Sequence, residues 1–152
     1  GIARAIALHP KLLILDEPTA GLDPVARREF LEIIMHQARE YGRTTFFSPH
    51  LLDEVERAAD RVGIIPQGQK RFEGRLDDLR DRVREVILSP ETELPEGFEI
   101  WRELEGSETE GAQRRVIAHA EPAAWVREGV QGKQLSLDDI FIACVGISTT
   151  RI

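Results

Sequence analysis

The sequence predicts an α/β fold in residues 1–74, followed by a small α+β domain in residues 75–152. Residues 12–15 form an apolar run without alternation, which is typical of a strand buried on both faces of a parallel sheet. Strand and helix signals alternate from this run up to Gly74. After Gly74 the strand signals become short and are separated by turns rich in Pro, Gly and Glu.

Local signals predict each element of the first domain. Asp23 before Pro24 is a strong helix start, because Asp accepts hydrogen bonds from free N–H groups and Pro suits the first helical position. Gly42 ends this helix, and its apolar stripe is expected at residues 30, 33, 34, 38 and 41. The segments expected in order are a helix at 2–8, strand 12–15, helix 24–41, strand 44–47, helix 51–59, strand 61–65, a turn at 66–69 and strand 70–73.

The second domain is expected to be a compact module with its own apolar helix. Ser136 suits the N-cap of this last helix. Its apolar stripe is expected at residues 137, 140, 141, 144 and 145. The preceding segments are a charged helix at 76–82, strands at 86–88, 98–101 and 116–118, and a short helix at 122–128.

Composition narrows the functional classes. Hydrophobic residues make up 41% of the chain, but no apolar run reaches membrane-spanning length. The single Cys144 excludes an internal disulfide framework and indicates a reducing, cytoplasmic setting. The net charge of −7 with no basic block argues against a nucleic-acid partner. Because the chain starts at Gly1 and its one methionine is Met35, we expect an upstream part to be missing.

Two adjacent carboxylates, Asp16 and Glu17, follow the apolar strand 12–15. Open α/β sheets bind ligands beyond the carboxyl ends of their strands. Neighbouring strand residues point to opposite faces, so the two acids are expected to have different roles. One can hold a magnesium ion, directly or through water, while the other faces an attacking water molecule. The structural alternative is an acidic turn that leaves the core.

Four segments together resemble ATP-binding-cassette (ABC) proteins. Residues 12–18 (LLILDEP) resemble the Walker B motif, residues 21–24 (GLDP) the D-loop, and residues 48–56 (SPHLLDEVE) the segment around the switch histidine. Residues 1–5 (GIARA) resemble the end of the helix after the signature loop. The order and spacing match the family. The resemblance therefore implies the C-terminal half of an ABC ATPase domain, which is a P-loop NTPase with a parallel sheet and helices.

The resemblance also implies a role for each matched residue. Asp16 would hold Mg²⁺ through its water shell beside bound ATP, and Glu17 would be the general base that polarises the attacking water. His50 would contact the γ-phosphate; its structural alternative is a helix-entry or surface histidine. Asp23 would communicate with a second ABC ATPase subunit across a dimer interface. Asp23 can also cap the following helix, and both roles can hold together.

Two features depart from the family pattern. Pro49 stands where the family has Ser or Thr before the histidine, which removes one backbone donor and fixes φ. The fine positioning of His50 is therefore expected to differ. No Gly-x-x-x-x-Gly-Lys-Ser/Thr phosphate loop occurs in the sequence, and the glutamine and signature loops are absent as well. We therefore expect this chain alone to be inactive.

The second domain carries a further resemblance. Residues 74–79 (GRLDDL) and 136–142 (SLDDIFI) resemble the C-terminal appendage of ABC subunits from drug- and polysaccharide-exporting transporters, with Asp138 in place of the usual Glu. A generic appendage that pads the first domain is the alternative. The resemblance implies an export-type ATPase subunit, held on the inner face of the membrane by a separate transmembrane permease. The alternatives are a soluble ABC-type ATPase unconnected with transport, or a non-catalytic assembly or regulatory module.

Overall fold

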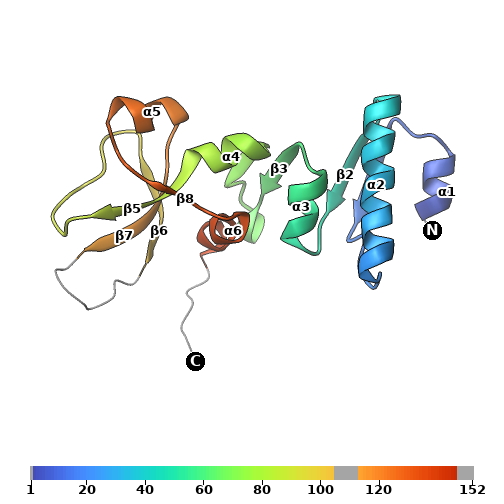
Figure 1. Cartoon of the computed structure of the whole chain (residues 1–152), viewed down its shortest axis with the longest axis horizontal. Coiled ribbons are helices and arrows are strands. Elements are labelled where there is room, and N and C mark those ends of the chain that lie inside the picture. Colours follow the sequence, from blue (N-terminus) through green and yellow to red (C-terminus); the bar gives the residue numbers. More distant parts are fainter. Residues whose placement is uncertain (1, 105–112, 147–152) are drawn as a thin grey trace. The chain divides into compact units, whose positions relative to one another are not determined.

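The computed structural model describes residues 2–104 and 113–146, which divide between two compact units, Gly1–Asp60 and Arg61–Ile152 (Figure 1). The hairpin of β3 (Arg61–Ile64) and β4 (Phe72–Arg75) belongs to the second unit, whereas the predicted boundary at Gly74 places it in the first domain. The domain boundary at Gly74 therefore stays a prediction.

The first unit contains a β-α-β arrangement (Figure 1). Strands β1 (Leu12–Asp16) and β2 (Thr44–Ser48) pair in parallel and are joined by α2 (Pro24–Tyr41). Helix α1 (Ile2–Ala7) precedes this arrangement and α3 (Leu52–Ala58) follows it. The predicted alternation of strands and helices is confirmed for this unit. The described sheet of this unit has two parallel strands, and the larger parallel sheet expected of a P-loop NTPase stays a prediction.

Helix α2 begins and ends where its sequence signals predict. The Oδ1 atom of Asp23 accepts hydrogen bonds from the backbone N–H groups of Val25 and Ala26, at 2.9 and 3.0 Å. Pro24 takes the first helical position, where its missing N–H removes no intrahelical bond. Gly42 ends the helix at φ 61°, a left-handed conformation that glycine adopts without strain.

The core of the first unit is small. It consists of the buried residues Phe30, Leu31 and Ile34, with Leu15, Leu22, Phe47 and Ala58 packed against them. The predicted stripe on α2 is wrong at Ile33 and Tyr41, which are exposed. The exposed ring of Tyr41 instead meets the side chain of Arg43, whose guanidinium carbon lies 4.8 Å from the ring centre.

One face of the β1–β2 pair lies open to solvent. Ile14 and Phe46 are each 68% exposed and Leu12 is 53% exposed. These side chains alternate along the strands with the partly buried residues that face α2. The prediction that residues 12–15 are buried on both faces is therefore wrong for the described structure, because α2 shields one side only.

The second unit contains a four-stranded antiparallel sheet in the order β6-β7-β5-β8. The strands are β5 (Val83–Leu88), β6 (Glu99–Leu104), β7 (Arg114–His119) and β8 (Lys133–Gln134). The first three confirm the predicted strands with longer bounds, whereas β8 has only two residues and was not predicted. The register of β6 against β7 shifts between Ile100 and Arg102, at Trp101.

The described part of the second unit also contains three helices and one 3₁₀ turn: α4 (Leu76–Arg82), α5 (Pro122–Arg127), α6 (Leu137–Val145) and η1 (Pro66–Gly68). All lie close to their predicted positions. The hydroxyl of Ser136 accepts the backbone N–H of Asp139 at 3.1 Å, which confirms the predicted N-cap of α6. No helix within residues 2–104 and 113–146 is long and apolar enough to cross a membrane.

The second unit has the larger core. Its main cluster consists of the buried residues Val86, Leu88, Val116, Ala118, Ala120, Ala124 and Trp125, with Leu94, Phe98 and Val130 packed against it. The rings of Phe98 and Trp125 meet edge to face, with centroids 4.8 Å apart. Helix α6 buries Leu137, Ile140 and Cys144 as predicted, but Phe141 remains exposed. The second unit therefore contains within itself the apolar contacts that a stable core needs.

Candidate functional site

The carboxyl ends of β1 and β2 lie at the same edge of the strand pair, because the strands are parallel and Asp16 pairs with Ser48 in register. Asp16 is the last residue of β1, and Glu17 follows it directly. His50 comes two residues after Ser48 ends β2 and is exposed. Three of the predicted site residues therefore lie in or next to the ends of two neighbouring strands.

The side chain of Ser48 connects the two acidic residues. Its hydroxyl donates a hydrogen bond to Oδ1 of Asp16 at 2.6 Å. The same oxygen accepts the backbone N–H of Glu17 at 2.8 Å. Ser48 was not among the predicted site residues. The available signal was the expected parallel pairing of the two strands, which sets the last residues of both strands side by side.

Glu17 leaves the strand in an unusual backbone conformation. Its φ is +40°, which is uncommon for a residue other than glycine. Because Glu17 lies outside β1, the alternation of strand side chains does not extend to it. Strand alternation therefore does not apply to Glu17, and the different roles of Asp16 and Glu17 stay a prediction. A turn follows at once, in which the N–H of Ala20 donates to the carbonyl of Glu17 at 3.0 Å.

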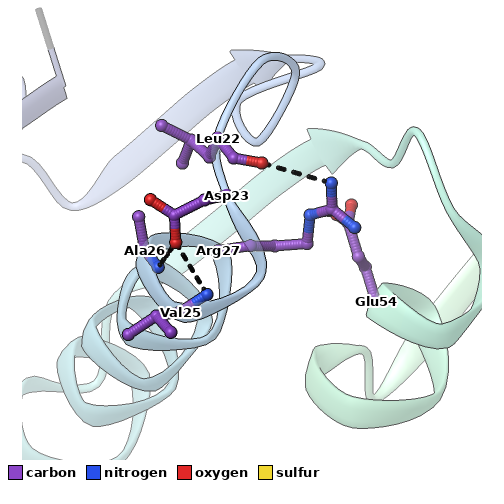
Figure 2. Close-up of polar contacts among 6 residues, drawn as sticks. All are labelled: Leu22, Asp23, Val25, Ala26, Arg27 and Glu54. Carbon is purple, nitrogen blue, oxygen red and sulfur yellow. Dashed lines mark hydrogen bonds and ion pairs between the residues drawn. The ribbon is translucent and has the colours of Figure 1, made fainter.

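The loop between β1 and α2 is anchored by polar contacts (Figure 2). Nη2 of Arg27 donates to the carbonyl of Leu22 at 3.4 Å, and Nε of the same side chain lies 3.4 Å from Oε1 of Glu54 on α3. The carboxylate of Asp23 is bound to the first turn of α2. Asp23 thus caps the helix as predicted, while its role toward a second subunit stays a prediction.

The oxygen atoms at the end of β1 suit a magnesium ion whose other ligands are water and substrate phosphates. Within residues 2–104 and 113–146, no group of three or more His, Cys, Asp or Glu side chains could enclose a metal ion. Magnesium usually binds to one or two carboxylates and completes its shell with water and substrate phosphates. The exposed carboxylate of Asp16, with the hydroxyl of Ser48 beside it, has the chemistry for such a partial site.

Among the residues that the structure describes, the titratable groups with clearly shifted pKa values lie in the second unit. Burial lowers the pKa of His119, whose ring stacks on that of Trp101 with centroids 4.8 Å apart. Burial also raises the pKa of the Cys144 thiol to about 12, which keeps the thiol protonated and unreactive at neutral pH. A hollow of about 520 Å³ in this unit is lined by Asp77, Arg80, Asp81, Gln134 and Leu135. None of the predicted site residues lines it.

Comparison with known proteins finds relatives that are named as ATP-binding proteins of transporters, although no family model matches the chain. An uncharacterized ABC transporter ATP-binding protein, YcbN of Bacillus subtilis, is 34% identical over 95% of this chain and 52% of its own length. The bacitracin transport ATP-binding protein BcrA of Bacillus licheniformis is 46% identical over 57% of this chain and 28% of its own. The energy-coupling factor transporter ATP-binding protein EcfA2 of Clostridium perfringens is 38% identical over 68% of this chain and 36% of its own length. The chain spans about half the length of the first relative and less of the other two.

Proposed function

This chain belongs to the family of ABC transporter ATP-binding proteins, and we propose that it is the C-terminal part of a subunit that hydrolyses ATP to drive transport. The relatives support this proposal, because they carry ATP-binding names and align over up to 95% of the chain. The observation that carries it is the acidic pair at the end of β1. Ser48 is hydrogen-bonded to both acidic residues there, and His50 follows two residues later.

Each predicted site residue has a place in the proposed reaction. Asp16 would hold Mg²⁺ through water, and Glu17 would take the proton of the attacking water as general base. His50 would contact the γ-phosphate. The magnesium ion, when bound, neutralises charge on the phosphate oxygens. The sequence holds no phosphate loop, so binding the other phosphates falls to a part of the longer protein that this chain does not contain.

The proposal extends to partners and place. A second ABC ATPase subunit would meet this one through the loop that carries Asp23, and a transmembrane permease would hold the pair at the inner face of the membrane, in the cytoplasm. The export direction rests on the resemblance of residues 74–79 and 136–142 to the appendages of exporter subunits. The relatives BcrA of Bacillus licheniformis and Enterococcus faecalis are named for bacitracin transport.

The acid–base assignment is tested by Glu17→Gln in the longer protein. Gln keeps the size of the side chain but cannot accept the proton, so we expect ATP turnover to fall by about 10²–10⁴-fold while ATP binding persists. Glu29→Gln is the matched control, because Glu29 is an exposed glutamate on α2. Retention of more than about a tenth of the wild-type rate would contradict the assignment.

A second measurement uses the 152-residue chain by itself. Without a phosphate loop this chain is expected to hydrolyse no ATP and to bind Mg-ATP weakly. Isothermal titration and a turnover assay on the same preparation would check both expectations. Sustained ATP hydrolysis by the purified chain would show that the remaining residues bind nucleotide in another way.

A further inference from the structure

We propose that Ser48 is a positioning residue that sets the orientation of the Asp16 carboxylate and the backbone of Glu17. This inference rests on the proposed function, in which Asp16 and Glu17 act on Mg-ATP and water. Ser48 is the one side chain in hydrogen-bond contact with both residues in the described part of the site. Ser48 is the last residue of β2, which follows α2 in the sequence, whereas Asp16 and Glu17 precede α2.

The hydroxyl of Ser48 is held by both of its contacts. A serine hydroxyl has one donor and two acceptor positions. Here the donor points to Oδ1 of Asp16 at 2.6 Å, the short distance typical of a hydroxyl bound to a carboxylate. The N–H of Glu17 reaches the same oxygen at 2.8 Å. The two bonds leave the hydroxyl no free rotation, so the Asp16 carboxylate receives its hydrogen bond from a fixed direction.

The chain around Ser48 is itself restrained. Ser48 pairs with Asp16 at the end of the parallel strands, and Pro49 follows it. A residue before proline is confined to extended conformations, because the proline ring clashes with it in a helical one. Pro49 therefore holds the Ser48 backbone extended, as the strand requires. Pro49, which departs from the family pattern, thus favours the Ser48 backbone conformation in which its hydroxyl contacts Asp16.

The bond to Glu17 acts on a strained position. The φ of +40° at Glu17 costs free energy for a residue with a side chain, and such conformations persist where the surroundings hold them. The N–H of Glu17 donates to Ser48, and its carbonyl accepts the N–H of Ala20. Loss of the Ser48 hydroxyl would remove one of these two restraints and release the backbone that carries the proposed general base.

The test compares Ser48→Ala and Ser48→Thr with Thr44→Ala in the longer protein. Thr44 lies on the same strand with an exposed side chain, so its hydroxyl is the matched control. Ser48→Ala is expected to lower kcat by about 10- to 100-fold and to raise the Mg²⁺ concentration for half-maximal activity, with little change in KM for ATP. Thr keeps a hydroxyl and suits a strand, so Ser48→Thr should restore most of the loss.

Amide hydrogen exchange supplies a readout apart from activity and can be made on the 152-residue chain. The Glu17 N–H should exchange faster in Ser48→Ala than in wild type, and at the wild-type rate in Ser48→Thr and Thr44→Ala. Unchanged Mg²⁺ dependence and unchanged Glu17 exchange in Ser48→Ala would overturn the proposal. A lower kcat alone would not rescue it, because a smaller fraction of active protein also lowers kcat. An inactive wild-type protein would instead count against the proposed function, and the exchange rates would still decide whether Ser48 holds Glu17.

Discussion

Arg27 and Glu54 form an ion pair (Figure 2), and their side chains differ in exposure. Glu54 is fully buried, whereas the Arg27 side chain is 24% exposed, and Nε lies 3.4 Å from Oε1. Arg27 also donates to the carbonyl of Leu22. The pair therefore ties α2 and the loop before it to α3, the helix that begins two residues after His50.

This difference in exposure predicts unequal effects of removing either partner. Arg27→Met leaves a buried carboxylate without a cation and should lower the free energy of unfolding by about 3–5 kcal/mol. Glu54→Met should cost less, because the Arg27 guanidinium can turn toward solvent. The double variant should be more stable than Arg27→Met alone. Urea unfolding followed by far-UV circular dichroism would give the double-mutant cycle.

An exposed pair on the same helix provides the control for this cycle. On α2, Nε of Arg28 lies 3.1 Å from Oε1 of Glu32, and both side chains are largely exposed. Their coupling should be only about 0.3–0.5 kcal/mol, as for other exposed pairs four residues apart on a helix. Equal losses from Arg27→Met and Glu54→Met would contradict the importance of the buried carboxylate.

The cap formed by Asp23 can be separated from its proposed role at a subunit interface. Asp23→Ala removes the acceptor for two N–H groups and should cost about 0.5–2 kcal/mol of stability. Asp23→Asn keeps an acceptor, so its stability should stay near that of wild type. A fall in ATP turnover in Asp23→Asn, at unchanged stability, would indicate that the interface needs the charge. Urea unfolding and turnover measure the two effects, and full stability of Asp23→Ala would contradict the cap.

His119 predicts a loss of stability as the pH falls. Burial lowers its pKa in the folded state, and nearby Arg82 and Arg71 act in the same direction while Glu99 and Glu121 oppose them. Below the ordinary pKa of about 6.5, the unfolded chain therefore binds more protons at this site than the folded chain. The Tm of the second unit should decrease between about pH 7 and pH 5.

Tryptophan fluorescence can follow this transition, because both tryptophans, Trp101 and Trp125, lie in the second unit. The control is His119→Gln, which cannot take up the proton. This variant should melt at a lower temperature at neutral pH, because it loses the stacking on Trp101, but its Tm should depend less on pH. The same pH dependence in both proteins would assign the effect to other groups.

The two units should differ in their resistance to proteolysis. The first unit has a small core around Phe30, Leu31 and Ile34 and an open apolar face at Leu12, Ile14 and Phe46, whereas the second unit has a larger core that includes Trp125. Each large apolar side chain that stays in water lacks the roughly 1.5–3 kcal/mol of stabilisation that full burial would contribute. Limited proteolysis with mass spectrometry should find early cuts before residue 61 and a resistant C-terminal piece. Uniform protection of both units with one cooperative melt would contradict this expectation.

The predictions that the structure confirms depend on local signals. Asp23, Pro24 and Gly42 mark the ends of α2 through bonds and dihedral angles set within a few residues. Ser136 marks the start of α6 in the same way. Strand bounds were less accurate, because pairing partners decide where a strand ends. The strand expected at residues 70–73 is shifted to Phe72–Arg75, where it pairs with Arg61–Ile64.

Features that depend on distant neighbours could not be predicted in the same way. The exposure of Ile14 is set by which faces other elements cover, and an apolar run alone does not specify this. The contacts of Ser48 with Asp16 and of Arg27 with Glu54 join residues about 30 positions apart. The motifs located Asp16, Glu17 and His50 at the strand ends. Their roles in catalysis stay predictions.

The β1-α2-β2 arrangement also bears on when the acidic half of the site can form during synthesis. Asp16 and Ser48 are 32 residues apart, and a single helical crossover closes the chain between them. The entropy lost on closing a loop grows only slowly with its length, and contacts at short sequence separation form fast. A growing chain can therefore bring these two side chains together once Ser48 has left the ribosome, before the whole of the second unit has emerged.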